Sequence, residues 1–447
     1  METKPPSVEA WRDRIEIRRA RPGDSRGVAE LWCDAFPGKR TVGDRMRMLE
    51  TGGRYGGLDT VLVGTDGAGV AAACKVYRME QHIAGAALPM MGLAAVAVAP
   101  SRRRRGLGAR LCVEAIRTAA ARGDAVSTLY PFRPEYYERL GWGLVGGLLD
   151  YRFHTGSLQR YEEARDVREA VLERDAERIA ACYARVASRS NGPITRDRQV
   201  WAYRLTGEDL GVRPVDADAA WTASADPKLR AVVYGQDRVS GYALLRYATR
   251  AARDEQVLEV RELVAEDERA YRGLLGHIAA QSDQWPHARH FARPGERFGD
   301  RLRDPRPPRH RAARSLYFPT ARIVRGPMLR IIDVERALLG RRWFDADEDG
   351  TAGTIQLTVE DAQRPENDGP WTVRIDGRAA EVARRADAAA GPRVRIATDP
   401  PTLARIYAGE LSASEAETLG RATVDGDRAF ADRAFATRER FWLLDEF

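Results

Sequence analysis

An arginine-rich segment with two glycines, at residues 96–110, has the residue types and the spacing to bind a pyrophosphate. An apolar run, Val96–Ala99, stops at a proline, and four arginines at 102–105 then precede Gly106 and Gly108. The pattern predicts a strand, a tight cationic loop and a helix N-terminus, whose backbone N–H groups and dipole favour an anion. Glycines have no Cβ, so the backbone can approach phosphates closely there.

The spacing Arg103-x-x-Gly106-x-Gly108 is the acyl-CoA signature R-x-x-G-x-G/A and resembles the GNAT family of N-acetyltransferases. It lacks the Gly-Lys-Ser/Thr of a Walker A loop and the G-x-G-x-x-G of a dinucleotide-binding turn. The alternative interpretation is that the arginines form a solvated or nucleic-acid-binding patch. The acyl-CoA interpretation is favoured because a simple charge run needs neither the glycines nor the preceding apolar strand.

Length and composition indicate a globular protein of several domains. The 447 residues exceed one ordinary core, so two or three domains are expected. The net charge of +7 comes from 72 basic and 65 acidic residues, a near balance that requires no nucleic-acid partner. No segment reads as a signal peptide, and the longest apolar run, near 86–99, is too short to span a bilayer. We therefore expect a cytoplasmic protein without a membrane partner.

The cysteines and histidines show no metal-binding pattern. Four widely separated cysteines, with no C-x-x-C pair, predict buried free thiols in a reducing compartment. The six histidines form no H-x-x-x-H or H-E-x-x-H motif; only His287 and His290 are close together, and Pro286 precedes them. A loop is therefore expected there rather than a metal site, and no metal cofactor is predicted.

The expected elements divide the chain into three domains of α/β and α+β class. Residues 1–150 alternate strands and helices in an α/β pattern. Residues 151–312 repeat the theme, but acidic residues at 266–268 stand where the arginine loop would be and would repel a pyrophosphate. This second unit is expected to keep the fold without the cofactor site. After a proline-rich boundary, residues 313–447 are expected to form an α+β domain that begins with a strand at 329–333.

Taken together, the three domains resemble the Eis (enhanced intracellular survival) acetyltransferases. The resemblance implies two fused GNAT-like domains, of which only the first binds acetyl-CoA, followed by a domain like sterol carrier proteins. It also implies a homo-hexamer that acetylates amines of polycationic small-molecule or peptide acceptors, aminoglycosides among them. The segments that carry the resemblance lie at 96–108, 136–143, 329–334, 403–409 and 445–447.

The resemblance assigns catalytic roles to residues that match the family motifs. Tyr137, six residues before Gly143, matches the general acid, and Tyr136 is its neighbouring competitor. The α-carboxylate of Phe447 matches the general base, which needs burial to raise its low reference pKa. Val98 N–H is expected to polarise the thioester carbonyl. The residues expected to bind acetyl-CoA are Val96, Ala97, Val98, Arg103, Arg104, Arg105, Gly106, Leu107, Gly108, Ala109, Phe132 and Arg133.

The acceptor site is expected to include Phe36, Asp304 and Glu446. Glu446 and the aspartate before it supply negative charge, which suits a polycation. Lys39 and Arg40 would repel a polycation if they faced the pocket. A polyamine, a lysine side chain or a peptide is therefore as open as an aminoglycoside.

Two functions of other classes are alternatives to acetyl transfer. A lipid or sterol carrier would use the third domain, with the acetyltransferase scaffold vestigial. A nucleic-acid-binding protein would use Arg102–Arg105 and the arginine-rich segment 301–314, but few aromatic residues lie among these arginines to stack on bases.

Overall fold

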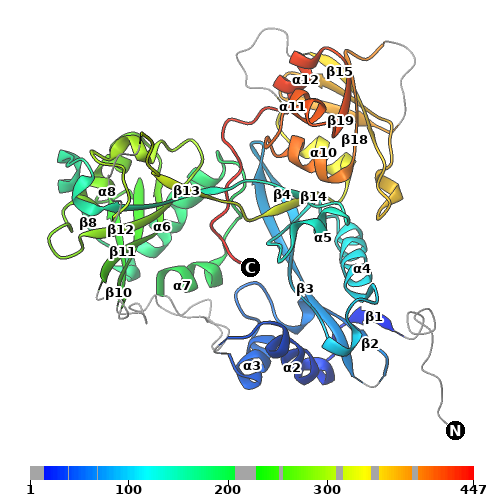
Figure 1. Ribbon diagram of the computed structural model, residues 1–447, viewed down its shortest axis with the longest axis horizontal. Coiled ribbons are helices and arrows are strands. Elements are labelled where there is room, and N and C mark those ends of the chain that lie inside the picture. Colours follow the sequence, from blue (N-terminus) through cyan, green and yellow to red (C-terminus); the bar gives the residue numbers. More distant parts are fainter. Residues whose placement is uncertain are drawn as a thin grey trace.

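The computed structural model describes residues 15–38, 40–67, 69–206, 228–250, 255–308, 316–343, 352–384 and 391–447, so Lys39 lies outside the described residues. These residues form two seven-stranded sheets and one five-stranded sheet. Each sheet lies in its own lobe, and the C-terminal segment runs from the third lobe into the space between the other two (Figure 1).

The first sheet holds the arginine loop. Its predicted cofactor helix forms as α4 (Leu107–Arg122), whose apolar residues at helical spacing pack on one face of the sheet. Helices α2 (Ser25–Ala35) and α3 (Val42–Thr51) lie beside the same sheet, and Trp32 of α2 packs with Ala73 and Ala97. The short helix α5 (Pro134–Glu138) follows the sheet's fifth strand. In sheet order the strands are β1 (Glu16–Arg19), β2 (Val61–Thr65), β3 (Val70–Ile83), β4 (Ala86–Val98), β5 (Val126–Leu129), β14 (Met328–Ile331) and β6 (Gly143–Leu144).

The position of strand β14 differs from the one expected from the sequence. The strand expected to begin the third domain, near 329–333, pairs instead with β5 and β6 of the first sheet. Its register sets Met328 opposite Leu129 and Ile331 opposite Val126. All four residues of β5 are buried, so this strand needs a partner on both edges. Periodicity identifies such a strand but does not identify its neighbour.

The second sheet repeats the parallel pair seen in the first. Strands β11 and β12 run parallel, as β4 and β5 do, and α8 (Glu268–Ala279) follows β11 as α4 follows β4. Helices α6 (Leu172–Ala187) and α7 (Arg198–Thr206) belong to the same unit. In sheet order the strands are β13 (Ala321–Val324), β7 (Leu148–His154), β12 (His287–Ala292), β11 (Glu255–Ala265), β10 (Gly241–Arg250), β9 (Leu229–Tyr234) and β8 (Val167–Glu169).

The two neighbouring histidines lie in strand β12 and not in the expected loop. Pro286 directly precedes the strand. Proline has no N–H to donate, and this is tolerated before a strand because only residues inside the sheet must donate to a neighbouring strand. His290 Nε2 lies 3.1 Å from Glu296 Oε1. Within the described residues, no group of three or more His, Cys, Asp or Glu side chains could hold a metal ion.

In the part of the chain that the structure describes, the third unit is a five-stranded sheet covered by four helices. Its interior is filled by large side chains, among them Trp343, Phe430 and Phe435, each 2% exposed or less. The helices are α9 (Val334–Gly340), α10 (Pro400–Tyr407), α11 (Ala413–Thr418) and α12 (Arg428–Phe435). In sheet order the strands are β17 (Ala379–Ala383), β16 (Trp371–Asp376), β15 (Gly353–Val359), β18 (Val394–Thr398) and β19 (Ala422–Gly426).

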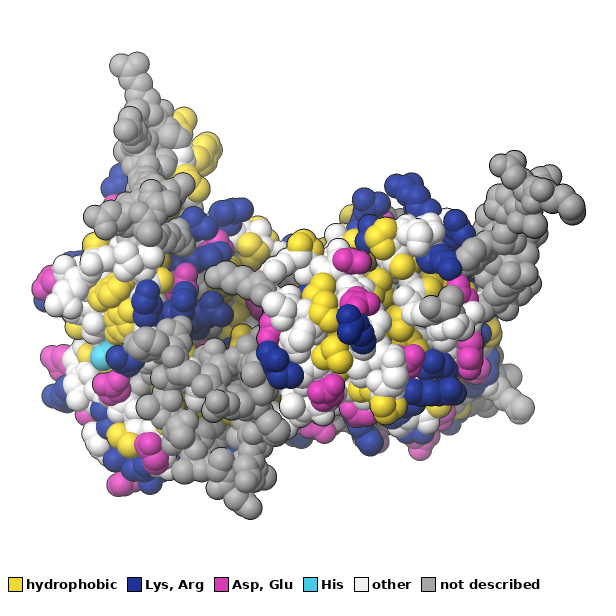
Figure 2. Space-filling view, turned by 90° about the horizontal axis from the view of Figure 1, so that it is seen from below, with side chains coloured by type: hydrophobic (Ala, Val, Ile, Leu, Met, Phe, Trp, Pro, Cys, Tyr) yellow, Lys and Arg dark blue, Asp and Glu magenta, His cyan; other side chains and the backbone are white. Residues whose placement is uncertain are grey.

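The burial of the cysteines and the distribution of charge on the surface agree with what the composition predicts. Three of the four free cysteines are buried, and Cys33 is half-buried. Basic and acidic side chains are interspersed on the face shown in Figure 2, as their similar totals lead one to expect. Among the described residues, the longest apolar helical stretch falls short of what a membrane crossing needs.

Candidate active site

The first sheet opens at Gly92. Strand β4 pairs with β5 only from Met90 to Gly92, whereas it stays paired with β3 as far as Val98. A register shift in the β3 pairing and a φ of 51° at Ala95 mark a bulge in this part of β4. Among the described strands, none pairs with the β5 side of β4 beyond Gly92. This leaves a stretch of strand edge that can pair with an extended ligand.

The backbone of Val98 points to this open edge. Ala99 N–H donates to the carbonyl of Ala71 on β3 at 2.9 Å. Because successive N–H groups of a strand point to opposite edges, Val98 N–H points away from β3. The Val98 carbonyl lies on the same edge and accepts a hydrogen bond from Arg103 Nε at 3.1 Å. A donor is thus directed at the edge that β5 has left.

The arginine loop connects this edge to α4. It begins with a 3₁₀ turn at Pro100–Arg102, and Arg102 pairs with Asp66 at 2.7 Å. Arg104 and Gly106 take left-handed φ values of 59° and 78°. Gly106 is the N-cap of α4 and provides no side-chain cap, so the first N–H groups of the helix have no capping oxygen there. The loop therefore presents arginines and helix N–H groups together.

The loop before α8 in the second sheet, which corresponds to the arginine loop, is unsuited to binding an anion. The side chain of Asp267 caps α8 by accepting a hydrogen bond from Ala270 N–H at 2.8 Å. Glu266 forms ion pairs with Arg185 and Arg238. The acidic residues predicted here thus occupy the N-terminus of α8, and their charge would repel a pyrophosphate.

We expect Gly106→Ala to weaken acetyl-CoA binding by about tenfold. A left-handed φ costs an L-residue roughly 1–2 kcal/mol, and 1.4 kcal/mol is about tenfold in affinity. Titration calorimetry measures this effect. Gly23→Ala is the matched control, because Gly23 has no left-handed φ and open space where a Cβ would stand. Equal affinities of the two variants would contradict the role given to the loop.

Two tyrosines of α5 lie next to the loop. A Cβ on Gly108 would be 2.7 Å from Tyr136 Oη and 3.5 Å from Val98 Cγ2, so glycine keeps the helix, the tyrosine and the strand close together. Tyr137 is 3% exposed, and its ring centroid is 5.6 Å from that of Phe132 and 6.1 Å from that of Trp142. Burial raises the pKa of Tyr137 well above its usual range. Its phenol therefore stays protonated at physiological pH.

The chain's last residues cross from the third unit to the first sheet, as the final part of the trace in Figure 1 shows. Trp442 N–H donates to the carbonyl of Asn191 at 2.9 Å, and Tyr130 Oη donates to the carbonyl of Asp445 at 2.9 Å. The Phe447 ring lies against Gly92, 3.2 Å from where its Cβ would be. Its centroid is 6.1, 6.5 and 5.8 Å from those of Tyr55, Tyr77 and Tyr130. Phe447 therefore lies at the fork between β4 and β5.

A buried ion network fixes this segment to the second sheet. Arg196 contacts Asp445 through Nε at 2.9 Å and through Nη2 at 3.1 Å, and Glu262 through Nη1 at 2.8 Å. Arg204 forms a further ion pair with Glu262. Burial alone would raise the pKa of Glu262, but the charges of Arg196 and Arg204 outweigh it and lower that pKa to about 2. Sequence reasoning missed this network because its members are distant along the chain.

We expect Arg196→Met to lower the free energy of unfolding by about 3 kcal/mol, because it leaves buried carboxylates with too little positive charge. Arg26→Met, which removes the exposed pair with Glu30, is the control and should change stability by less than about 1 kcal/mol. Denaturant unfolding measures both variants. A loss no larger than that of the control would contradict the network's role.

The same network predicts a pH dependence. Because the folded-state pKa of Glu262 lies below its ordinary value of 4.5, its contribution is present above about pH 4.5. It is lost as pH falls toward about 2. Wild-type stability should decline over this range more steeply than that of Glu262→Gln.

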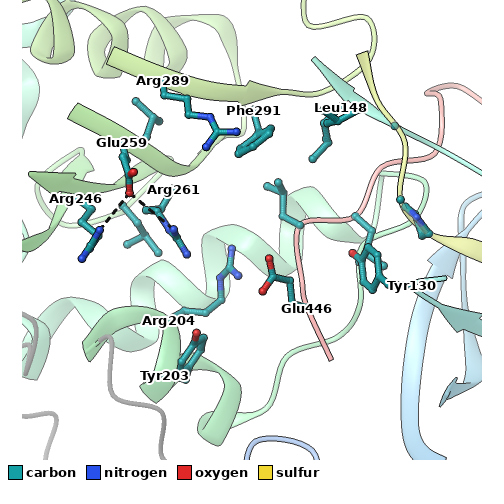
Figure 3. A pocket seen from close by; sticks show the side chains of 18 of the residues that line it. Tyr130, Leu148, Tyr203, Arg204, Arg246, Glu259, Arg261, Arg289, Phe291 and Glu446 are labelled. Atoms are coloured by element: carbon teal, nitrogen blue, oxygen red, sulfur yellow. Dashed lines mark hydrogen bonds and ion pairs between the residues drawn. The ribbon is translucent and has the colours of Figure 1, made fainter. Parts of the chain in front are cut away.

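A cavity of 570 Å³ lies between the second sheet, α7 and the C-terminal segment (Figure 3). Glu446 lines it, whereas Phe36 and Asp304, the other expected acceptor contacts, are not among its lining residues. Phe36 is 39% exposed at the end of α2, and Asp304 is bonded to Arg306 at 2.8 and 2.7 Å. Of the three expected residues, the structure therefore brings only Glu446 to this cavity. The roles of all three stay predictions.

Comparisons with known proteins agree with this architecture. Residues 16–145 and residues 192–331 each match an acetyltransferase (GNAT) domain, and residues 334–444 match a sterol carrier protein domain. A protein of Streptomyces griseus named as an uncharacterized N-acetyltransferase is 27% identical over 97% of this chain and 100% of its own. A similarly named protein of Streptomyces avermitilis is 26% identical over 92% of each chain.

Solved structures share the fold over nearly the whole chain. A GCN5-related N-acetyltransferase from Anabaena variabilis superposes with a TM-score of 0.78 at 20% identity, over 97% of this chain and 100% of its own. Eis1 from Mycobacterium abscessus gives a TM-score of 0.73 at 20% identity with the same coverage. The expected order of two GNAT folds and a sterol carrier fold is confirmed. Two acetyltransferase (GNAT) domains, followed by a sterol carrier protein domain, make up this chain, which is an acyltransferase.

Proposed function

We propose that the protein transfers the acetyl group of acetyl-CoA to an amine, at the fork between β4 and β5. GNAT domains use acetyl-CoA as co-substrate. The observation that carries the proposal is the coincidence of three features at this place. They are the open edge of β4, the arginine loop at its end, and Phe447 against Gly92 at its start.

The open edge and the loop suit the two halves of the co-substrate. The amide-bearing pantetheine arm can pair with the backbone of Val96, Ala97 and Val98 as an added strand would. The pyrophosphate can accept hydrogen bonds from the first turn of α4 while the loop arginines balance its charge. The lack of a side chain at Gly108 fits this arrangement, since a Cβ there would meet Tyr136. Phe132, 71% exposed, and Arg133, the N-cap of α5, are adjacent to the two tyrosines.

Transfer requires a neutral amine, a stabilised oxyanion and a protonated leaving group. In our proposal the Phe447 carboxylate attracts the acceptor ammonium and takes its proton, directly or through a water molecule. The amine nitrogen then forms a bond to the thioester carbon, and Val98 N–H stabilises the developing oxyanion. When the C–S bond breaks, Tyr137 gives its proton to the sulfur and CoA leaves as the thiol. The attacking nitrogen gives up its second proton to water as the amide forms, water reprotonates the phenolate, and the Phe447 carboxyl releases the ammonium proton to solvent, so the proton balance closes.

In our proposal the acceptor is an amine, and polycations such as aminoglycosides are candidates through the resemblance to Eis enzymes alone. Glu446, whose side chain enters the cavity (Figure 3), supports an ammonium partner there. Asp445 adds little to this, because Arg196 neutralises it. The hexamer and the cytoplasmic location implied by the same resemblance remain predictions.

Thiol release from acetyl-CoA tests the proposal. Untagged protein is assayed against aminoglycosides, polyamines, amino acids and basic peptides, and acetyl-CoA binding is measured in parallel by calorimetry. We expect binding of acetyl-CoA and amine-dependent thiol release. Failure to bind acetyl-CoA would overturn the proposal. Replacing Gly92, at the fork, by a bulky residue should displace Phe447. Acetyl transfer that persists in this variant would also overturn the proposal.

A further inference from the structure

The cavity beside the C-terminal segment has a strongly uneven distribution of charge. The described residues that line it include six arginines, at positions 54, 204, 246, 261, 289 and 325, and two acids, Glu259 and Glu446. Its volume of 570 Å³ is typical of a small-molecule site. Tyr130 lines it as well and contacts Phe447, so the cavity leads to the fork.

The sheet forms a wall of arginines on one side of the cavity. Arg246 of β10 is in register with Glu259 of β11, which is in register with Arg289 of β12. Residues in register share a face of a sheet. Arg261 lies at the register shift between β10 and β11 and joins them because its guanidinium reaches the Glu259 carboxylate. Figure 3 shows these four side chains together on the sheet side of the cavity. We refer to Arg246, Arg261 and Arg289 as the arginine wall.

The acids near the wall are already engaged. Glu259 is shared by Arg246 at 3.5 Å and Arg261 at 3.9 Å. Asp150 binds Arg289 through two hydrogen bonds of 2.7 and 3.0 Å. Among the residues that the structure describes, a polycation would therefore meet arginines at this wall rather than open carboxylates. A guanidinium has five N–H donors, so Arg289, with two hydrogen bonds to Asp150, and Arg261, paired with Glu259, keep donors for a ligand.

Glu446 lies on the opposite side of the cavity. It comes from the C-terminal segment, one residue before Phe447, and Figure 3 shows its carboxylate facing the interior. Within the described residues, it forms no ion pair with an arginine or lysine. The cavity thus presents one carboxylate on the side of the fork and three arginines on the side of the sheet.

Further cations lie behind the fork. Lys75 is 7% exposed, with its ammonium 5.3 Å from the Tyr77 ring centroid. Burial, followed by the charges of Arg40, Arg54 and Arg45, lowers the pKa of Lys75 to about 8. Neighbouring cations thus give this region a positive potential, which repels a ligand carrying many ammonium groups.

We propose that the cavity takes an amine acceptor that also carries an anionic oxygen group, a carboxylate or a phosphate. The amine lies toward Glu446 and Phe447, and the anion binds the arginine wall. This inference rests on the proposed acetyl transfer, because it identifies that reaction's acceptor. A zwitterion matches both sides of the cavity, whereas a polycation matches only one.

Matched acceptor pairs test the proposal. L-lysine is compared with 1,5-diaminopentane, which lacks only the carboxylate, and glucosamine 6-phosphate with glucosamine. Hydrogen bonds to charged groups contribute about 1.5–3 kcal/mol each, so kcat/KM should be at least about tenfold higher for the anionic member of one pair. The pair with the larger ratio distinguishes a carboxylate from a phosphate.

Two arginine variants locate the effect. Arg261→Gln should reduce that ratio by about tenfold, the loss expected for one charge-assisted contact. Arg272→Gln, which lies outside the cavity and pairs with Glu163, should leave the ratio as in the wild type. Equal or higher kcat/KM for the diamine and for spermidine would overturn the proposal, as would an unchanged ratio in Arg261→Gln.

A binding measurement decides the case in which no acceptor of the panel is acetylated. With CoA present, succinate and inorganic phosphate are titrated into wild type and Arg261→Gln. Binding of either anion that weakens in the variant supports the proposal, and binding of spermidine alone overturns it. If succinate, phosphate and spermidine all fail to bind, the proposal is also overturned. Loss of acetyl-CoA binding itself would instead remove the proposed function, so the two failures are distinguishable.

Discussion

Replacing Tyr137 with phenylalanine is expected to lower kcat for amine acetylation by about 10²- to 10⁴-fold, the range that a positioned general acid supplies. The variant loses one hydroxyl and keeps the ring contacts with Phe132 and Trp142. Without the phenol proton, CoA must leave as a thiolate, so cleavage of the C–S bond becomes slower. Acetyl-CoA binding should remain, because the hydroxyl is not assigned to that step.

Tyr136→Phe is the matched control for this experiment. Its ring centroid is 5.0 Å from that of Tyr137, and its hydroxyl lies beside Gly108 and not at the assigned donor position. Steady-state thiol release with both substrates saturating compares the two variants. A larger loss of kcat in Tyr136→Phe than in Tyr137→Phe would transfer the acid role to Tyr136.

The pH profile gives a second test of the acid. A general acid loses activity as pH rises through its own pKa in the folded protein. Since burial raises the pKa of Tyr137 above its ordinary value of 10.0, kcat should not decline on the alkaline side below about pH 10. A decline near neutral pH that Tyr137→Phe abolishes would contradict the environment described for this phenol.

Appending one glycine after Phe447 is expected to reduce kcat by about 10²-fold or more. The Phe447 ring can keep its contacts with Tyr55, Tyr77 and Tyr130, but the carboxylate moves by the length of a residue. A displacement of about 1 Å can already cost about 10²-fold in rate. Deleting Phe447 should have at least the same effect, because the ring and the local carboxylate position are then both lost.

Two controls separate the carboxylate from the ring. Phe447→Leu keeps an α-carboxylate at the same position and should retain more activity than the glycine extension. An N-terminal glycine extension of the same protein should leave kcat unchanged. Calorimetry should show that acetyl-CoA still binds the C-terminal variants. A glycine-extended enzyme with full activity would exclude the Phe447 carboxylate as the base.

Local chemistry made part of this structure predictable. The glycines of the arginine loop identify a tight loop and a helix start, and the observed N-cap at Gly106 matches that expectation. Gly123 likewise ends α4 with a left-handed φ of 86°. Such features depend on the steric properties of single residues, so they can be recognised without knowledge of the remaining chain.

Long-range pairing could not be predicted in the same way. Nothing within residues 328–331 specifies β5 as their partner, because a short buried strand has the same apolar sequence pattern whichever sheet it joins. The arginine wall is a further example, since Arg246, Arg261 and Arg289 become neighbours only through the registers of β10, β11 and β12. The buried pairing of Arg196 with Asp445 spans 249 positions of sequence. Each of these depends on tertiary context that periodicity does not contain.

The position of β14 has a consequence for the order in which the protein folds during synthesis. The first sheet contains residues 16–144 and also residues 328–331, so its β5 edge stays open while the whole second unit is being translated. Domains generally fold as units from the N-terminus, but here the N-terminal sheet is completed after most of the second sheet has emerged. A nascent chain interrupted between them presents the buried strand β5 at an open edge, the kind of surface that chaperones must cover.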